Sequence, residues 1–527
     1  MRASLGLWSL GYSRMSVRDE AAPIRDGAPP VADSREASVK RSAVRGAVWT
    51  MVSYTGTQSL RLLSNLILSR LLFPAAFGQM TLVFTFITGL QMFSDLGTGR
   101  AIIQSKRGDD QDFLRTGWTI QCARGALLWI ASCAIAIPVA RFYEQPVLVS
   151  LIPVAGLSAL IAGFDSTSVF RQQKHLRLER LTVVDLVAQL IGVVTTVSLS
   201  LVVWRSGSEE RYAVWALVAG TLVSSTIRMV LTHTFLPGCS HRFQLDRGAW
   251  REYLAFGRWI FVSTLLTFFA TQTDRLIFGK MIPVALLGVY SFAATIAMLP
   301  TQAVSGVGNN VVFPTYSQLA ARDDFGSLFW RVRMPIVLAG GAIVTAMIAC
   351  GPFLVAILYD ERYREAGWML QILSAGSWFR MLEAATSAAL LAKARVRWLA
   401  AGNAAKLAGL FLFIPIGYSV AGFPGALVGL AIADCLKYAV SVAGGTLGGL
   451  RGFGGDAAAT AGVAAVAGLA SVAGSALLER GWGNFVGFFV SAVGACVPWA
   501  VVGVWYVGRA RALAARLATA DSRISDS

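Results

Sequence analysis

Long apolar runs dominate this sequence and limit what it can fold into. Stretches near or above the roughly 20 residues that a helix needs to cross a bilayer recur from Val48 to Val507, and short charged connectors separate them. The chain of 527 residues is 55% hydrophobic and only 14% charged, with a mean hydropathy of +0.60. This composition excludes a water-soluble protein of this size and predicts an all-α membrane protein.

The apolar runs predict about fourteen transmembrane helices. The predicted spans are 46–69, 77–98, 117–140, 147–169, 182–204, 213–236, 253–278, 285–313, 334–358, 366–391, 399–420, 425–445, 457–478 and 484–507. The polar, proline-bearing residues 1–39 predict a disordered cytoplasmic leader, because Leu5–Leu10 is too short for a secretory signal. Residues 508–527 predict a basic cytoplasmic tail.

The net charge of +17 reflects membrane topology and not nucleic-acid binding. Thirty of the 46 Lys and Arg residues lie in the leader, the tail and alternate loops, whereas eight lie in the loops on the other side. This asymmetry predicts that both termini are cytoplasmic. The six cysteines and three histidines show no metal-ligand spacing, so the sequence predicts no metal site, no disulfide framework and no cofactor.

An internal repeat indicates that the chain contains two related halves. Trp49-Thr-Met-Val-Ser matches Trp259-Ile-Phe-Val-Ser at an offset of 210 residues, and Pro74 and Gly78 match Pro283 and Gly288 with a one-residue slip. Six spans separate the copies, so both begin on the same membrane side. We therefore expect two pseudo-symmetric six-helix lobes, at residues 40–252 and 253–445, followed by two additional transmembrane helices at 446–507.

Eight basic residues fall inside the predicted spans, where a cation costs at least about 2.5–3.5 kcal/mol unless it faces an interior or a wet cavity. They are Arg61, Arg124, Arg228, Arg258, Arg275, Arg380, Lys406 and Lys437. Those near span ends, such as Arg228, Arg258 and Arg275, are open to a second interpretation, in which the side chain extends to the membrane surface. Arg61, Arg124 and Lys406 have no acidic residue three or four positions away on the same helix.

Two of the other cations have acidic neighbours at helical spacing. Arg380 lies three residues before Glu383, and Asp434 lies three residues before Lys437, so the favoured interpretation is a local ion pair in each case. Asp274 and Arg275 are adjacent and therefore point to different faces of their helix. We expect one of them to address a cavity.

Several segments resemble bacterial polysaccharide flippases of the multidrug/oligosaccharidyl-lipid/polysaccharide exporter superfamily. They are Thr273-Asp-Arg-Leu-Ile-Phe-Gly-Lys280, Leu287-Gly-Val-Tyr-Ser-Phe-Ala293, Ser69-Arg-Leu-Leu-Phe-Pro-Ala-Ala-Phe-Gly78, Asp95-Leu-Gly97, Arg100-Ala-Ile-Ile-Gln104, Phe313-Pro314 and Gln318-Leu319. The resemblance implies a two-lobed bundle in the bacterial inner membrane that works by alternating access. It also implies a substrate, an undecaprenyl-diphosphate-linked oligosaccharide moved from the cytoplasmic to the periplasmic leaflet, and partners among polysaccharide polymerases and export machinery.

A diphosphate carrier needs cations along its path, because guanidinium and ammonium groups suit phosphate oxygens. The candidate substrate-binding residues are Arg61, Arg124, Arg275, Arg380, Lys406, Asn65 and Asp274. Gln58, Tyr54, Gln272 and Trp378 are candidates for holding sugar, with ordinary helix packing as the alternative.

Three other functions compete with a polysaccharide flippase. A multidrug or cation exporter of the same superfamily would line its pocket with carboxylates and aromatic rings, and a peptidoglycan-precursor flippase would carry a related lipid. A membrane-embedded saccharide ligase or polymerase is disfavoured, because the sequence has no GxSxG, P-loop or HExxH motif and its external connectors are short. The sequence therefore predicts a transporter and not an enzyme.

Overall fold

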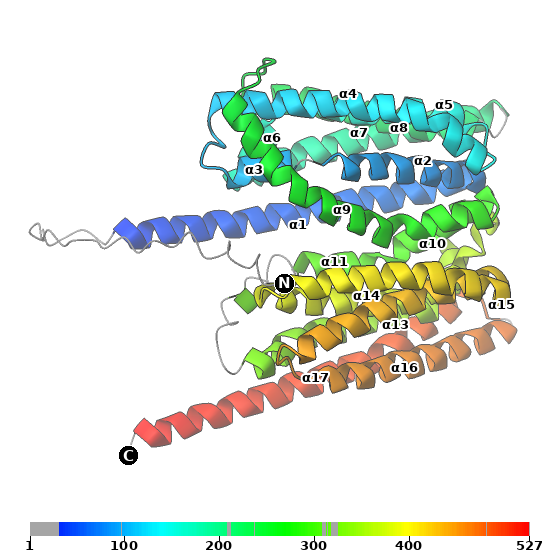
Figure 1. The fold of residues 1–527 in the computed structure, drawn as a ribbon. Helices are drawn as coiled ribbons and strands as arrows, with labels where there is room; N and C mark the ends of the chain where they lie inside the picture. The colour runs from blue at the N-terminus through cyan, green and yellow to red at the C-terminus, as the bar shows by residue number, and fades with distance from the viewer. Residues whose placement is uncertain are drawn as a thin grey trace, which may run out of the picture.

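The computed structural model describes residues 31–525 apart from residues 96, 208–211, 237, 308–311, 313–314, 318–324 and 481. The described residues form helices joined by short connections, and no strand occurs among them. Most helices run side by side along one axis, and α1 begins on the same side of the molecule on which α17 ends (Figure 1). We call this side the terminal face and the other the opposite face.

The helices form two lobes followed by a final pair. The N-lobe contains α1 (Val31–Leu71), α2 (Pro74–Phe93), α3 (Thr98–Gln104), α4 (Gln111–Phe142), α5 (Leu148–Gly163), α6 (Ser168–Lys174), α7 (Leu178–Arg205) and α8 (Ala213–Thr234). The C-lobe contains α9 (Arg247–Met281), α10 (Val284–Ala297), α11 (Leu299–Val307), α13 (Phe325–Leu358), the short η3 turn (Glu361–Tyr363), α14 (Ala366–Ala392) and α15 (Val396–Thr446). The final pair is α16 (Phe453–Glu479) and α17 (Asn484–Ser525), which pack on α13.

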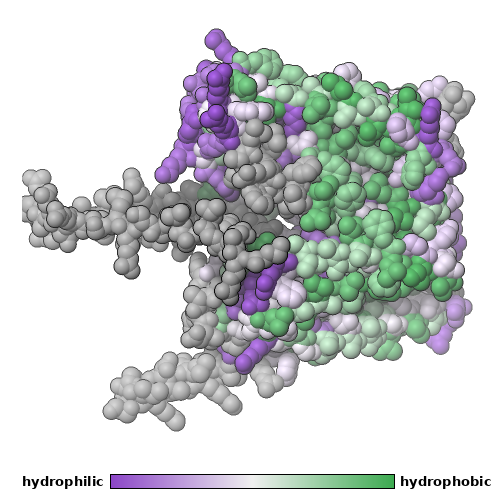
Figure 2. Space-filling model, in the orientation of Figure 1, coloured by the Kyte–Doolittle hydropathy of each residue, from purple (hydrophilic) through white to green (hydrophobic). Residues whose placement is uncertain are grey.

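The surface fits a membrane protein, because a broad apolar belt lies between hydrophilic ends (Figure 2). Among the described residues, nine helices are long and apolar enough to cross a bilayer, or ten if the bent pair α5 and α6 is one span. The 51-residue α15 is one of the nine, although Ala421 and Gly422 break it into two halves. Every predicted span overlaps a helix, so the all-α membrane fold is confirmed, while the number fourteen stays a prediction.

Some boundaries differ from those expected. Helix α1 begins at Val31, inside the segment expected to be a disordered leader, and residues 1–30 lie outside the described residues. Helix α17 continues to Ser525, so most of the expected tail is helical. Helix α9 begins before residue 253, and its Tyr253 ring stacks on Phe113 of α4 at 4.6 Å. The first turns of α9 therefore pack on the N-lobe, and the helix links the two lobes.

The lobes meet near the opposite face through a reciprocal backbone contact. Helix α2 begins at Pro74 and α10 follows Pro283, and proline suits the first turn of a helix. A Cβ atom on Gly78 would lie 1.8 Å from the Val284 carbonyl oxygen, and a Cβ atom on Gly288 would lie 1.9 Å from the Pro74 carbonyl oxygen. Neither glycine has room for a side chain. These are the positions that the sequence repeat pairs, so the two halves meet through equivalent surfaces.

Polar contacts reinforce this closure. Arg362 donates to the Arg70 carbonyl oxygen at 3.1 Å, and the Tyr363 hydroxyl donates to the Leu72 carbonyl oxygen at 3.2 Å. Lys280 at the end of α9 forms an ion pair of 2.6 Å with Glu144, which follows α4. The lobes are therefore held together at the opposite face.

A buried ion pair fastens the final helices to the C-lobe. Arg333 of α13 is completely buried and lies 2.5 Å from Asp456 of α16, which also accepts a hydrogen bond from the Tyr438 hydroxyl. Trp499 of α17 donates to the Thr345 hydroxyl of α13 at 3.1 Å. The predicted span 334–358 begins just after Arg333, whereas α13 begins at Phe325 and carries Arg333 into the core.

A larger side chain at Gly78 will force the lobes apart at the opposite face, because backbone atoms occupy the Cβ position. We predict that Gly78→Leu lengthens the distance between spin labels at Gln145 and Arg364, measured by pulsed electron paramagnetic resonance. Gly468→Leu is the matched control, because nothing lies within 4 Å of a Cβ atom on Gly468. A folded Gly78→Leu protein with the unaltered distance distribution would contradict this account of closure.

Candidate functional site

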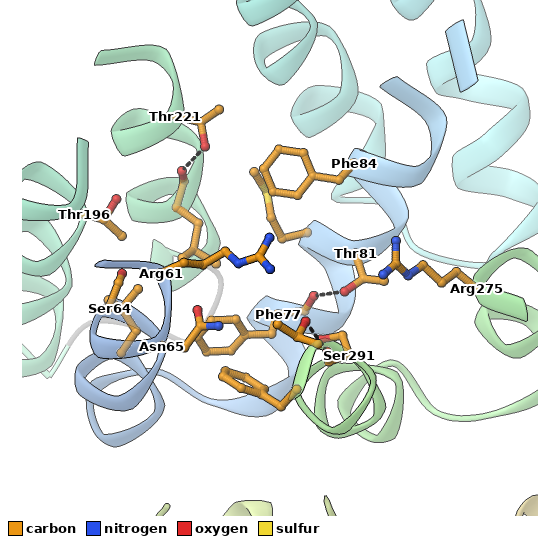
Figure 3. Close-up of a pocket in the computed structure, with 15 residues that line it drawn as sticks. Arg61, Ser64, Asn65, Phe77, Thr81, Phe84, Thr196, Thr221, Arg275 and Ser291 are labelled. Atoms are coloured by element: carbon orange, nitrogen blue, oxygen red, sulfur yellow. Dashed lines mark hydrogen bonds between the residues drawn. The ribbon is translucent and has the colours of Figure 1, made fainter. Parts of the chain in front are cut away.

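A cavity of about 350 Å³ lies where helices of the two lobes meet. Its lining comes from α1 and α2, from α7 and α8, and from α9 and α10 of the C-lobe, so it is an inter-lobe space that we call the central cavity. Its polar lining residues are Arg61, Ser64, Asn65, Thr81, Thr196, Thr221, Arg275, Ser291 and Thr295. Figure 3 shows these side chains around the opening.

Two guanidinium groups approach this cavity from different lobes. Arg61 and Asn65 lie one turn apart on α1 and therefore share a face, while Arg275 extends from α9 (Figure 3). Arg275 donates to the Gln272 side-chain oxygen at 2.8 Å, and its Nε has no partner among the described residues. Arg61 forms no ion pair with any acid in the described part of the chain. Both positive charges are therefore without an acidic partner there.

A second cavity, of about 250 Å³, lies within the C-lobe, and we call it the C-lobe cavity. Its charged and hydrogen-bonding residues include Asp274, Arg275, Tyr290, Arg380, Glu383, Lys406, Asp434 and Lys437. Arg275 lines both cavities, so α9 stands between them. Six of the seven predicted site residues thus line one cavity or the other.

The charges of the C-lobe cavity are paired between α14 and α15. Asp434, only 1% exposed, lies 2.8 Å from the Lys406 ammonium and 3.2 Å from the Arg380 guanidinium. Lys437 lies 3.2 Å from Glu383. Each pair joins different helices or different halves of α15, so the network holds the lobe together.

This pairing corrects two sequence expectations. The favoured local pairs, Arg380 with Glu383 and Asp434 with Lys437, exchange partners across the two helices. Lys406, which has no acidic neighbour at helical spacing, pairs with Asp434 from the other half of α15. Helical spacing shows only which neighbours are available on the same helix. The close packing of α14 on α15 offers partners that spacing does not reveal.

Asp274 of α9 has a different partner. Its carboxylate accepts a hydrogen bond from the Tyr290 hydroxyl of α10, while the adjacent Arg275 turns toward the central cavity. The expectation that these two residues point to different faces therefore agrees with the structure, and both reach a cavity.

Arg124 does not line either cavity. It donates to the Gln91 carbonyl oxygen at 2.7 Å and to the Ser94 hydroxyl at 2.9 Å, at the C-terminal end of α2. A cation at a helix C-terminus is favourable because carbonyl oxygens there lack helical partners. Arg124 lines a separate space within the N-lobe, beside Gln121 and Asp165. Arg124 therefore does not line the inter-lobe space in this structure, and its role in binding substrate stays a prediction.

Other residues singled out from the sequence have structural partners. Arg228 pairs with Asp165 and, at 2.9 Å, with Asp185, so its side chain does not extend to the membrane surface. The side chain of Arg258 is not among those that the structure describes. Trp378 donates to the Thr460 hydroxyl at 2.9 Å and packs α14 against α16.

Two of the proposed sugar-binding residues join the lobes instead. Gln58 and Tyr54 of α1 both donate to the Gln302 side chain of α11, the latter at 3.2 Å. Gln272, a third such candidate, accepts a hydrogen bond from Arg275. These contacts give the inter-lobe space a polar border.

The motif that begins at Asp95 forms a turn. The Asp95 carboxylate accepts a hydrogen bond of 2.9 Å from the Gly97 amide, and Gly97 has φ of 65°, which favours glycine. The remaining motif residues Leu96, Phe313, Pro314, Gln318 and Leu319 lie outside the described residues.

The combined charge of the two cavities is positive. The C-lobe cavity has four cations and three carboxylates, and Arg61 adds a further cation in the central cavity. In the described part of the chain, no three His, Cys, Asp or Glu side chains are grouped to hold a metal ion. The arrangement suits an anionic, oxygen-rich ligand, because arginine and lysine bind such oxygens through charge-assisted hydrogen bonds.

Comparison with known proteins places the chain in a family. The family described as "Polysaccharide biosynthesis protein" matches residues 67–367, which is more than half of the chain. The chain belongs to the polysaccharide biosynthesis protein family. The resemblance to polysaccharide flippases noted in the sequence is therefore confirmed.

Relatives of this polysaccharide biosynthesis protein carry consistent names. The "Lipopolysaccharide biosynthesis protein WzxC" of Escherichia coli (strain K12) is 23% identical over 416 residues, covering 77% of this chain and 81% of that protein. The "Teichuronic acid biosynthesis protein TuaB" of Bacillus subtilis (strain 168) is 20% identical, covering 68% of this chain and 73% of that protein. The "Succinoglycan biosynthesis transport protein ExoT" of Rhizobium meliloti (strain 1021) is 22% identical, covering 53% and 54%.

Solved structures share the fold. The "Lipid II flippase MurJ, inward closed conformation" has a TM-score of 0.69 at 10% identity, covering 88% of this chain and 99% of that chain. An "inward-facing conformation of a multidrug resistance MATE family transporter of the MOP superfamily" has a TM-score of 0.58 at 15% identity, covering 74% and 93%. This polysaccharide biosynthesis protein therefore has the fold of these membrane transporters.

Removing the Asp434 charge will leave Arg380 and Lys406 buried without a counter-charge. Breaking a buried ion pair from one side costs about 3–5 kcal/mol. We predict that Asp434→Asn lowers the thermal unfolding midpoint of the detergent-purified protein well below that of Arg364→Gln, whose exposed ion pair with Glu361 contributes little. Equal midpoints for the two variants would show that the α14–α15 network does not stabilise the fold.

Proposed function

We propose that this protein is a flippase that moves an undecaprenyl-diphosphate-linked oligosaccharide from the cytoplasmic to the periplasmic leaflet for surface polysaccharide biosynthesis. The family match and the names of the relatives support a role in making exported polysaccharide. The membrane fold, shared with a lipid II flippase, supports transport of a lipid-linked saccharide. The surface polysaccharide it serves would be an exopolysaccharide, a capsule or an O-antigen.

One observation carries the proposal: Arg61 and Arg275 point into the inter-lobe cavity without an acidic partner among the described residues. Other cations of the described spans have partners of their own. Arg228 pairs with two aspartates and Arg380 with Asp434, while Arg124 donates to neutral oxygens at the end of α2. An unneutralised cation inside a membrane protein is costly, so its retention indicates a functional partner. A diphosphate would supply negative oxygens to both guanidinium groups at once.

The saccharide would occupy the remaining polar surface of the central cavity. Asn65, Ser64 and Thr221 line it beside Arg61 and offer hydrogen-bond donors and acceptors to hydroxyl groups. Phe77 and Phe84 add aromatic faces. A few convergent polar groups in an otherwise apolar pocket are typical of a small-molecule site.

The way the lobes meet supports alternating access. The reciprocal contact of α2 and α10 closes the opposite face, so release on that side requires the lobes to separate there. The contact depends on small residues and on a few exposed polar links such as Lys280 with Glu144, which contribute little stability. A rigid-body rotation of one lobe against the other can therefore open it.

The cavity charges weigh against the competing functions. A net positive cavity would repel the cationic substrates of a multidrug or cation exporter. A peptidoglycan-precursor flippase would also carry a diphosphate, but the names of the curated relatives favour polysaccharide as the product. We propose transport without enzymatic chemistry. Polysaccharide polymerase and export proteins would act as partners on the translocated product.

We further propose that the protein lies in the bacterial inner membrane with both termini cytoplasmic. At the terminal face, Arg171, Lys174 and His175 gather around Asp109, and the ion pair with Lys174 and the hydrogen bond from His175 lower the pKa of Asp109 to about 2. Basic residues concentrate in cytoplasmic loops of such proteins.

Removing the charge of Arg61 or of Arg275 will weaken binding of the diphosphate. A charge-assisted hydrogen bond is worth about 1.5–3 kcal/mol, so we predict that Arg61→Gln and Arg275→Gln each lower transport per folded molecule roughly 10- to 150-fold, and that the Lys variants lose less. The measurement is surface polysaccharide and accumulated cytoplasm-facing lipid-linked saccharide, corrected for protein abundance.

Arg124→Gln is the matched control, because Arg124 lies within a helix but outside both cavities. Its transport per folded molecule should stay close to that of the unaltered protein. Full export by both Arg61→Gln and Arg275→Gln would rule out a role for these guanidinium groups in binding the diphosphate.

The topology proposal has a separate test. A reporter fused after Ser527 should report a cytoplasmic location, and one inserted at Gln145, at the opposite face, a periplasmic one, because basic residues favour the cytoplasmic side. Alkaline phosphatase and green fluorescent protein fusions distinguish the two locations. A periplasmic signal after Ser527 would reverse the assignment.

A further inference from the structure

An apolar crevice of about 680 Å³ lies on the seam between the lobes, outside both cavities described above. It is bounded by Phe86 of α2 and Phe142 of α4 on one side, and by Leu276 and Ile277 of α9 and Phe411 of α15 on the other. Phe142 is 58% exposed and Phe411 60% exposed. Exposed aromatic rings at the rim of an apolar crevice indicate that it opens to lipid and not to water.

The crevice and the central cavity lie on opposite sides of α2 and α9. On α9, Arg275 faces the cavities while Leu276 and Ile277 face the crevice, and on α2 Phe84 faces the cavity while Phe86 faces the crevice. The α2–α9 seam therefore separates a cationic space from an apolar one. A lipid diphosphate has the same division between a charged head and an apolar chain.

The depth of the crevice matches one leaflet. Its α9 residues run from Phe269 to Met281, about 18 Å at 1.5 Å per residue, which is a little more than half of a hydrocarbon core roughly 30 Å thick. Lys280 is next to the last residue of α9 and so lies at the end near the opposite face. The crevice thus follows the leaflet next to that face and places a cation at its surface.

The Lys280 charge is available to a phosphate. Its only ion pair among the described residues is the exposed one with Glu144, and such pairs contribute little. Its ammonium also lies 5.6 Å from the centre of the Phe142 ring at the rim of the crevice. A lipid phosphate at this position would meet a cation above an apolar channel.

A buried hydroxyl group distinguishes this crevice from an ordinary lipid-facing surface. Thr273 is 2% exposed and lines the crevice, and its hydroxyl has no hydrogen-bond partner among the described residues. A saturated acyl chain would leave it unsatisfied. The carbon–carbon double bonds repeated along an isoprenoid chain accept weak hydrogen bonds from hydroxyl groups through their π electrons.

We propose that this crevice binds the isoprenoid chain of the lipid-linked substrate after translocation, with the phosphate end at Lys280 and the chain reaching Thr273. The inference rests on the proposed function and adds a place for the chain in the leaflet of the opposite face. The head group would leave the central cavity through the α2–α9 seam. In the closed state, packing of Gly89 against the Phe268 ring seals this seam.

Photo-crosslinking tests the proposal in the full-length protein reconstituted in vesicles of phosphatidylethanolamine and phosphatidylglycerol. The photoreactive residue p-benzoylphenylalanine replaces Phe411 at the rim or, as a matched control, Leu412, which is 54% exposed on the same helix but does not line the crevice. The probe is tritiated undecaprenyl phosphate. We expect about five-fold or more labelling at position 411 relative to 412.

Excess unlabelled undecaprenyl phosphate should remove this labelling, whereas excess phosphatidylglycerol should not. Lys280→Gln and Thr273→Val, and Leu276→Trp as a variant that fills the crevice, should each reduce it. Equal labelling at positions 411 and 412, or equal competition by phosphatidylglycerol, would show an ordinary lipid-facing groove and overturn the proposal.

The Arg61→Gln variant separates this proposal from the function on which it rests. It should lose transport and keep the labelling at position 411, because Arg61 lies in the central cavity. Transport without preferential labelling would overturn the proposed binding of the isoprenoid chain in the crevice and leave the proposed function standing. Preferential labelling in a protein that moves no lipid-linked saccharide would overturn the proposed function and leave an isoprenoid-binding crevice.

Discussion

A charge inside the hydrocarbon region needs a counter-charge or water, because otherwise it costs several kcal/mol. The C-lobe meets this requirement by placing Asp434 between Arg380 and Lys406, and α16 is fastened by Arg333 with Asp456. These pairs connect helices that are distant in sequence, so charge neutralisation also fixes the packing. Arg61 and Arg275 have no acidic partner in the described part of the chain, and both face the space between the lobes.

The second determinant of the structure is the contact between equivalent helices of the two lobes. Gly78 and Gly288 allow α2 and α10 to approach so closely that each backbone occupies the place of the other's side chain. Because the two halves present the same surface to each other, one contact holds the opposite face closed without extensive polar bonding. Such an interface is packed closely enough to exclude a ligand, and because few polar bonds cross it, the lobes can separate, as a transporter requires.

Sequence reasoning predicted the all-α membrane fold, because apolar run length is a local property. Six of the seven residues it proposed for the substrate site line one of the two cavities. Sequence reasoning did not predict which charges pair. Arg380 and Lys437 exchange their expected partners, and Lys406 gains Asp434 through packing between separate segments. The partners of Arg124 and Arg333 could not be predicted either, since tertiary contacts bring the end of α2 to Arg124 and Asp456 of α16 to Arg333.

The most direct test of the central claim is transport by the purified protein. Vesicles that contain it would be loaded on both leaflets with a fluorescent undecaprenyl-diphosphate-linked oligosaccharide, and a membrane-impermeant quencher would then be added outside. If the protein is a flippase, the quenched fraction rises beyond the outer-leaflet fraction found in protein-free vesicles, as inner-leaflet lipid reaches the outside. A quenched fraction equal to that of protein-free vesicles, with folded protein present, would contradict the account.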